Sequence, residues 1–246
     1  MRIGILETGK LLPAIEAEHG DYSTLFARLF HAVDPEIGFT TFAVVDGQLP
    51  AGPDEADGWL ITGSRHGVYD DLPWMEPLKT FLRAAVAAGR PVVGICFGHQ
   101  ILAEAMGGRV EKSDRGWGCG VQDYQVVEAA PWMQGAEGTF STLAMHQDQV
   151  VDLPPEARVL AGSDFCPYAA LAYGDPAAPG AVSVQFHPEF TPALDGALIE
   201  LRRGDAIPEA VASPALASLA RRTDHLVWAD WIVQYLRQAT ARKSAA

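Results

Sequence analysis

The chain has little of what an extracellular, membrane-bound or metal-binding protein usually contains. Its 246 residues include only three cysteines, Cys96, Cys119 and Cys166, and their spacing forms no C-x-x-C pair. Neither a disulfide framework nor a zinc or dithiol motif is therefore indicated. The opening MRIGILETGK lacks the long apolar segment of a signal peptide, and no apolar run is long enough to cross a membrane. We therefore expect reduced thiols, a cytoplasmic location and no membrane partner.

Basic residues are scarce as well. Lys and Arg number 18 against 31 Asp and Glu, which gives a formal net charge of −13. An acidic chain repels polyanions, and no basic cluster overrides that repulsion, so no nucleic-acid partner is predicted. Hydrophobic residues make up 48% of the sequence, which at this length is enough to build a sizeable core. These features favour a protein that acts on a small molecule.

Short apolar runs alternate with helical patterns in the first half of the chain. Strands are predicted at RIGIL, FTTFAVV, GWLITG and RPVVGI, and helices at DYSTLFARLFHAV, LPWMEPLKTFLRAAVAAG and FGHQILAEAMGG. This alternation predicts right-handed βαβ units. The fold class that follows is three-layer α/β, with a mostly parallel, doubly wound sheet.

The second half has a different pattern. From Val121 onward the chain contains shorter β-like pieces, which predict a small extra antiparallel sheet on the same domain. After Pro192 the pattern becomes helical, and one long helix is predicted from about Pro214 to Ala241. Its apolar stripe would consist of Leu216, Leu219, Leu226, Val227, Trp231, Ile232 and Leu236. We expect a catalytic domain over residues 1–191 and a helical extension over residues 192–246 that packs on it.

One cysteine lies where a strand is predicted to turn into a helix. Cys96 follows PVVGI and is flanked by Gly94 and Gly98, which gives the sulfur counterpart of the G-x-S-x-G nucleophile elbow. Glycines at these two positions relieve crowding in a strained turn, and the helix N-terminus favours the thiolate, which is the attacking species. The alternative is a buried structural cysteine, as free cysteines usually are. We assign that structural role to Cys119 and Cys166.

A thiolate nucleophile needs a base and a group that orients the base. The segment AVSVQFHPEF ends a strongly β-like run with His187 and, two residues later, Glu189. In an extended chain, residues i and i+2 point to the same side, so the carboxylate can reach the imidazole. Cys96, His187 and Glu189 are therefore the candidate catalytic residues.

Together these segments resemble the class I glutamine amidotransferases, which hydrolyse the side-chain amide of glutamine. That family typically has a G-x-C-x-G-H-Q elbow, matched here by residues 94–100, and an H-P-E signature, matched by residues 187–189. The loop ITGSRHGVYDD and the segment MHQDQV also resemble family stretches. Several motifs are similar to stand-alone members such as the γ-glutamyl peptidases, which act on glutathione conjugates. The resemblance implies a flavodoxin-like sheet of the class I glutamine amidotransferase type.

The resemblance also implies roles for further residues. The backbone N–H groups of Ser64 and Phe97 would form the oxyanion hole, although the family's usual G-G-P reads Gly-Ser-Arg here. Such a loop keeps its donor if the backbone φ of Ser64 is negative. Substrate binding is expected at the following set: Gly63, Gln100, Met145, His146 and Gln147.

We expect no cofactor and no metal. A zinc site of Cys96, His99 and His187 fits the spacing less well than a nucleophile does, because it lacks a carboxylate or a second thiolate. His99 is expected to anchor the elbow helix. The glycine-rich GWGCG segment lacks the Lys-Ser/Thr end of a phosphate loop and is expected to form a turn near the pocket.

Three functions remain open on the sequence alone. The first is a glutaminase that delivers ammonia to a separate synthase, because no acceptor domain is recognisable in the chain. The second is a γ-glutamyl peptidase that needs no partner. The third is a catalytically idle relative that serves as a binding module. The first two share glutamine or a γ-glutamyl compound as a small-molecule substrate, and the intact triad disfavours the third.

Overall fold

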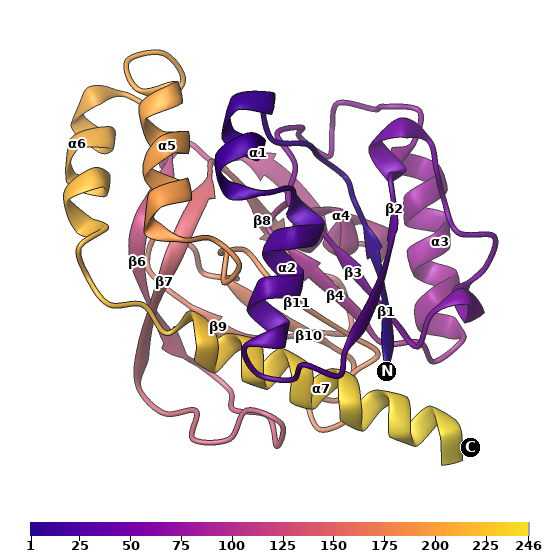
Figure 1. The fold of residues 1–246 in the computed structure, drawn as a ribbon. Coiled ribbons are helices and arrows are strands. Elements are labelled where there is room, and N and C mark those ends of the chain that lie inside the picture. The colour runs from indigo at the N-terminus through magenta and orange to yellow at the C-terminus, as the bar shows by residue number, and fades with distance from the viewer. Residues whose placement is uncertain (246) are drawn as a thin grey trace.

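The structure is a computed structural model that describes residues 1–245. Its main sheet has nine strands in the order β2-β1-β3-β4-β11-β10-β9-β6-β7 (Figure 1). The first five in that order run parallel: β2 (Gly38–Phe42), β1 (Arg2–Leu6), β3 (Gly58–Ile61), β4 (Val92–Ile95) and β11 (Ala181–Val184). This part of the fold confirms the predicted parallel sheet.

The other four strands of the main sheet are antiparallel to their neighbours. They are β10 (Ala170–Tyr173), β9 (Ala157–Gly162), β6 (Gly118–Val126) and β7 (Thr139–His146). A separate antiparallel pair consists of β5 (Arg109–Lys112) and β8 (Asp148–Asp152). Most of the antiparallel pieces predicted after Val121 thus extend the main sheet, and the small extra sheet comes from segments that the sequence pattern did not identify as strands.

Helices cover both faces of the sheet, which gives the three predicted layers. One face packs against α1 (Pro13–His19), α2 (Tyr22–His31), α5 (Pro192–Arg202), α6 (Glu209–Ser218) and α7 (His225–Ala245). The other face packs against α3 (Met75–Ala87) and α4 (Phe97–Ala105). Two short 3-10 turns lie at Val44–Asp46 and Pro53–Glu55. Alternate residues of a strand point to opposite faces of the sheet, so they belong to two hydrophobic cores. Ile3 and Ile5 lie in the core on the α2 and α7 side, whereas Trp59 and Ile61 lie in the core on the α3 and α4 side.

The prediction of a single long helix from about Pro214 to Ala241 is wrong. The chain forms α6 and α7 instead, and Asp224 between them ties the break to β7. The Asp224 side chain accepts a 2.9 Å hydrogen bond from the backbone N–H of Ser141, and its own N–H donates to the Ser141 carbonyl at 2.7 Å. The predicted stripe breaks with the helix, because Leu226 and Val227 at the start of α7 are 47% and 41% exposed.

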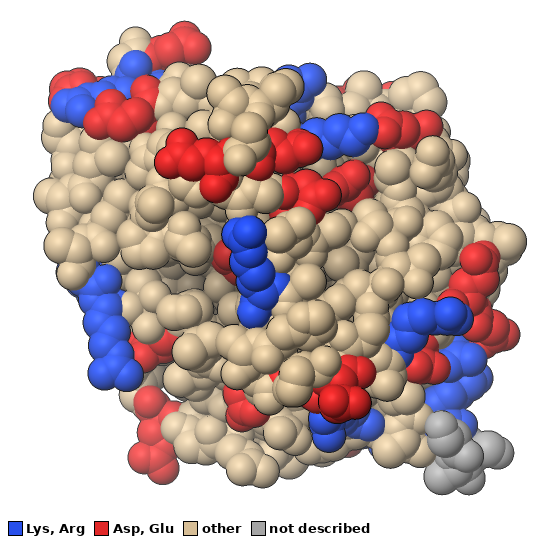
Figure 2. All heavy atoms as spheres, viewed as in Figure 1, with Lys and Arg blue, Asp and Glu red and all other residues tan. Residues whose placement is uncertain are grey.

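The charges on the surface are mixed. On the face shown in Figure 2, Lys and Arg side chains lie singly or in small groups beside Asp and Glu side chains. Within residues 1–245, no helix is long and apolar enough to cross a membrane.

Candidate active site

Cys96 occupies the strained turn between β4 and α4. Its φ of 53° and ψ of −103° place it in a conformation that side-chain-bearing residues rarely adopt. The flanking glycines allow this turn: a Cβ on Gly94 would lie 2.4 Å from the Gly98 carbonyl oxygen, and one on Gly98 would lie 2.4 Å from the Ile61 carbonyl oxygen. The strand, the elbow and the helix are therefore packed backbone to backbone, and the sulfur is held at the carboxyl end of β4.

The order of the parallel strands brings the remaining residues to the same place. β3, β4 and β11 are adjacent, so the loops that follow them meet at one edge of the sheet. These loops carry Ser64, Cys96 and His187 respectively. The edge where carboxyl ends of parallel strands meet is the usual ligand-binding position of doubly wound sheets.

His187 is held on two sides. Its Nδ1 lies 2.7 Å from a carboxylate oxygen of Glu189, and its ring stacks on Phe190 with centroids 3.8 Å apart and an interplanar angle of 11°. Both His187 and Glu189 are buried. Because Nδ1 is occupied by Glu189, Nε2 is the ring nitrogen left for proton transfer. The contribution of Phe190 was not predicted from the sequence, where an aromatic residue after H-P-E carries no signal.

The electrostatics distinguish His187 from the other buried histidines near the site. Burial alone lowers the pKa of His187, but the Glu189 carboxylate and the nearby Cys96 sulfur outweigh it and raise the pKa above the usual 6.5. For His99 and His146 burial dominates, and it lowers their pKa values to about 3 and about 4. His187 is therefore the one of these three that is suited to carry a proton.

His99 anchors the elbow helix, as expected. Its Nδ1 lies 2.8 Å from the hydroxyl of Ser183 on β11, and Tyr173 contacts the same hydroxyl at 3.1 Å. Within residues 1–245, no group of His, Cys, Asp and Glu has an arrangement that could hold a metal ion.

The two residues expected to supply backbone donors to the oxyanion hole lie next to Cys96 in the sequence or line the same pocket. Phe97 is the first residue of α4, and Ser64 follows β3. In residues 1–245, only Asp71 and Cys96 are non-glycine residues with a positive φ, so the serine at position 64 costs no backbone strain. The loop is supported by the segment that follows β1, where the Thr8 hydroxyl donates to the Thr62 carbonyl oxygen at 2.9 Å.

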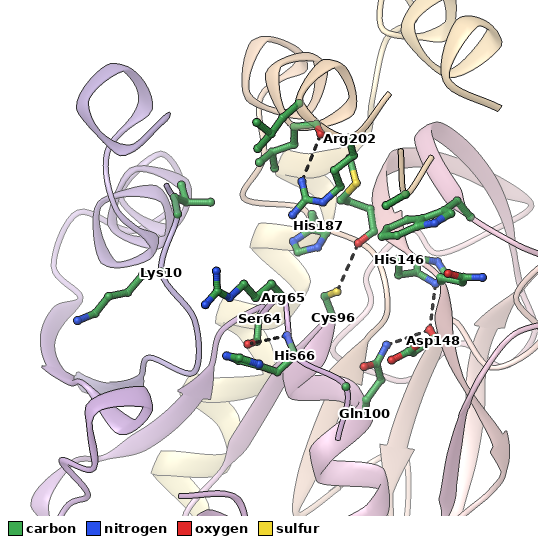
Figure 3. A pocket seen from close by; sticks show the side chains of 18 of the residues that line it. Lys10, Ser64, Arg65, His66, Cys96, Gln100, His146, Asp148, His187 and Arg202 are labelled. Carbon is green, nitrogen blue, oxygen red and sulfur yellow. Dashed lines mark hydrogen bonds between the residues drawn. The ribbon is translucent and has the colours of Figure 1, made fainter. Parts of the chain in front are cut away.

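A pocket of about 480 Å³ opens above the sulfur (Figure 3). Of the residues expected to bind substrate, Gln100, Met145, His146 and Gln147 line it together with Ser64, Cys96 and His187. Gly63 lies behind His187 instead, since a Cβ on it would come within 3.0 Å of the His187 ring. The glycine-rich turn predicted at GWGCG is only partly correct: Trp117 lines the pocket, but β6 begins at Gly118.

The opposite wall of the pocket comes from α1 and α5, where no site residue was predicted. Leu12 at the start of α1 and Leu201 at the end of α5 are about half exposed at this wall, with exposed fractions of 46% and 49%. Two arginines also line the pocket: Arg202 at the end of α5, which Figure 3 shows above His187, and Arg65 in the loop after β3, for which the sequence left open a substrate contact and a solvent-exposed position. Neither arginine takes part in any of the ion pairs found within residues 1–245, and Arg202 donates only to the Leu198 carbonyl oxygen on its own helix, at 3.2 Å.

The three thiols are expected to differ sharply in reactivity. Burial raises the pKa of Cys119 to about 11 and that of Cys166 to about 12, so both remain protonated at neutral pH. Cys96 lies in the pocket next to His187. Brief treatment with iodoacetamide at neutral pH should modify Cys96 at least about tenfold faster than either other cysteine, as measured by peptide mass spectrometry. Equal modification of all three would contradict this assignment.

Comparison with known proteins agrees with the sequence motifs. Residues 47–201 match the family described as "Glutamine amidotransferase class-I". The chain is 30% identical to Gamma-glutamyl peptidase 5 of Arabidopsis thaliana over 72% of its own length and 70% of that protein. It is 37% identical to the GMP synthase [glutamine-hydrolyzing] of Thermus thermophilus over 53% of its own length, but only 24% of that protein.

A solved structure has the same fold. A glutamine amidotransferase from Thermotoga maritima superposes with a TM-score of 0.74, covering 96% of this chain and 98% of that one. The sequence identity in this comparison is 19%, so the likeness concerns the fold alone.

Proposed function

Since the chain belongs to the class I glutamine amidotransferase family, we propose that it hydrolyses γ-glutamyl amide bonds with Cys96 as the nucleophile. The observation that supports this proposal is the arrangement of Cys96, His187 and Glu189 at the ends of the adjacent strands β4 and β11. Each group has a suitable partner, because the sulfur faces a base and the base is oriented by a carboxylate 2.7 Å away.

The reaction proceeds in two halves. The Cys96 thiolate attacks the γ-carbonyl carbon, and the carbonyl oxygen becomes an oxyanion beside the N–H groups of Ser64 and Phe97. His187 donates its Nε2 proton to the nitrogen of the leaving group as the carbon–nitrogen bond breaks, which leaves a γ-glutamyl thioester. Water then attacks the thioester, His187 accepts its proton, and glutamate leaves as the thiolate forms again. A donor of the oxyanion hole contributes about 10²–10³-fold to kcat.

The test is turnover by the purified protein alone. Glutamine and γ-glutamyl dipeptides are supplied side by side, and glutamate release is measured. Release from at least one of them that stops after Cys96 is alkylated supports the proposal. If no γ-glutamyl compound is hydrolysed and a thiol-reactive glutamine analogue fails to label Cys96, the idle binding module becomes the better description.

The pocket favours a γ-glutamyl peptidase over a glutaminase that supplies a separate synthase. Pockets of about 300–1,000 Å³ hold ligands considerably larger than glutamine, and this one has about 480 Å³. Its α1–α5 wall offers the apolar side chains of Leu12 and Leu201 and the cation Arg202, and a second cation, Arg65, lines the same pocket from the loop after β3. A leaving group with an apolar part and a carboxylate would complement that wall, whereas ammonia would leave it unused.

This preference predicts an effect of Arg202→Gln. Hydrolysis of a γ-glutamyl dipeptide with a free C-terminal carboxylate should lose about ten- to hundredfold in kcat/KM, because a charge-assisted hydrogen bond is removed. Hydrolysis of the same dipeptide with an amidated C-terminus should change little. Arg158→Gln, on β9 and outside the pocket, is the matched control. An equal loss with both substrates would show that Arg202 does not bind the leaving group.

A further inference from the structure

A chain of buried amides leads to the sulfur of Cys96. The side-chain nitrogen of Gln100 lies 2.9 Å from the backbone carbonyl oxygen of Asp148 and 3.1 Å from the side-chain oxygen of Gln185. The side-chain nitrogen of Gln185 in turn lies 3.7 Å from the Cys96 sulfur. Gln185 is fully buried, and Gln100 and Cys96 are only 3% and 5% exposed. Figure 3 shows the first link, with Gln100 below Asp148 and close to Cys96.

The contact with Asp148 fixes the donor and acceptor direction of every hydrogen bond in this series of amides. A backbone carbonyl can only accept a hydrogen bond, so the Gln100 atom that faces Asp148 must be the NH₂ group. The same NH₂ group faces Gln185, which must therefore present its oxygen to Gln100. The NH₂ group of Gln185 is then left to face the sulfur, and the opposite orientation would place two donors against each other.

We propose that Gln185 is a further catalytic residue, which donates a hydrogen bond to the Cys96 thiolate, and that Gln100 is a positioning residue that fixes the direction of this donor. The proposal rests on Cys96 being the nucleophile of the proposed function. It also narrows the role expected for Gln100: both hydrogens of its NH₂ group are used, one by Asp148 and one by Gln185, so only its side-chain oxygen is left to contact a substrate.

The donor acts selectively on the ionised sulfur. As a thiol, Cys96 can donate to the Met145 carbonyl oxygen, which lies 3.9 Å away. As a thiolate it can only accept, and the Gln185 N–H is a buried donor already aimed at it. A hydrogen bond to a charged partner is stronger than one between neutral groups, so the contact favours the thiolate over the thiol.

Other ionisable groups also face the sulfur. They are His187 beyond β11, Tyr22 on α2, Tyr124 on β6 and Cys166 before β10. Burial raises the pKa values of both tyrosines far above neutrality and that of Cys166 to about 12, so these three remain neutral near pH 7. His187 is the one that can carry charge there, and it is unchanged in the variants below.

The test measures the rate of Cys96 alkylation by iodoacetamide from about pH 5 to 9, by mass spectrometry of the Cys96 peptide. Gln185→Met should move the midpoint of the pH profile up by about one unit and lower the rate at pH 6 about tenfold. Gln100→Met should move it in the same direction by less, since Gln185 remains but is free to turn. The double variant should match Gln185→Met alone, because Gln100 acts only through Gln185.

Gln149→Met is the control, since Gln149 on β8 is a buried glutamine outside this chain of contacts, 4% exposed. Its profile should coincide with that of the wild type. If thermal melting shows that Gln185→Met is unfolded, the isosteric Gln185→Glu replaces it. That variant should shift the midpoint of the alkylation pH profile at least as far, because it puts an acceptor against the sulfur.

Two results would overturn the proposal: a Gln185→Met profile that superimposes on the wild type, or a Gln100→Met shift that is undiminished when Gln185 is already methionine. Because alkylation needs no substrate, the two proposals can fail separately. If the variants show the expected shifts but the wild-type protein hydrolyses no γ-glutamyl compound, the proposed function is contradicted and the role of Gln185 stands.

Discussion

Replacing Cys96 with serine should reduce γ-glutamyl hydrolysis by about 10⁴-fold or more. A serine hydroxyl is a far weaker acid than a thiol, so the nucleophile would be protonated in nearly every molecule. The shorter bond to oxygen also withdraws the attacking atom from the substrate. The measurement is kcat/KM for the best γ-glutamyl substrate of the wild type.

The fold should survive this change. The hydrogen-bond contacts of the Cys96 sulfur with Gln185 and Met145 are long, 3.7 Å and 3.9 Å, and serine keeps a side chain of nearly the same size in the strained turn. The melting temperature of Cys96→Ser should therefore stay close to that of the wild type. Cys119→Ser is the matched control, a buried cysteine on β6 that should keep its turnover. A Cys96→Ser enzyme with turnover near that of the wild type would refute the assignment of the nucleophile.

The elbow could be predicted from the sequence because its physical cause is local. Two glycines bracket a cysteine where a β-branched run ends, and the steric reason for each glycine lies within a few residues or on the adjacent strand. The pairing of Cys96 with His187 is a long-range feature, and it was anticipated because a thiolate nucleophile needs a base and His187 comes with an orienting carboxylate two residues later.

The amide chain could not be predicted in the same way. Gln185 looks like any polar residue at the end of a strand, and its partners Gln100 and Cys96 are 85 and 89 positions away. No periodicity or spacing encodes those contacts. The roles expected for Gln100 came from a family resemblance, which indicates that a position matters but not which neighbour uses it.

The break between α6 and α7 has a similar cause. The apolar pattern runs on from Leu216 to Leu236, so periodicity favours one continuous helix. What ends it is the pairing of Asp224 with Ser141 on β7, which is 83 positions away. Local helix preference was outweighed by a tertiary contact, as often happens in a packed domain.

Gly94→Ala should affect both stability and activity. A Cβ at this position would lie 2.4 Å from the Gly98 carbonyl oxygen and 2.9 Å from the His99 backbone nitrogen. Both are backbone atoms of the first turn of α4, so no flexible side chain can move aside to make room. We expect a loss of about 3 kcal/mol in the free energy of unfolding, or roughly 6–12 °C in melting temperature. Displacement of α4 also carries Cys96 away from His187, which should lower kcat about a hundredfold or more.

Gly38→Ala is the matched control for this change. Gly38 is also a strand glycine, at the start of the edge strand β2, but a Cβ there would meet nothing within 4 Å. Its melting temperature and turnover should be those of the wild type. Comparing Gly94→Ala with Cys96→Ser then separates a chemical defect from a geometric one. Cys96→Ser should lose turnover at unchanged stability, whereas Gly94→Ala should lose both turnover and stability. Wild-type stability and turnover in Gly94→Ala would mean that the elbow is not packed backbone to backbone, and steric crowding would then not be the reason for a glycine at this position.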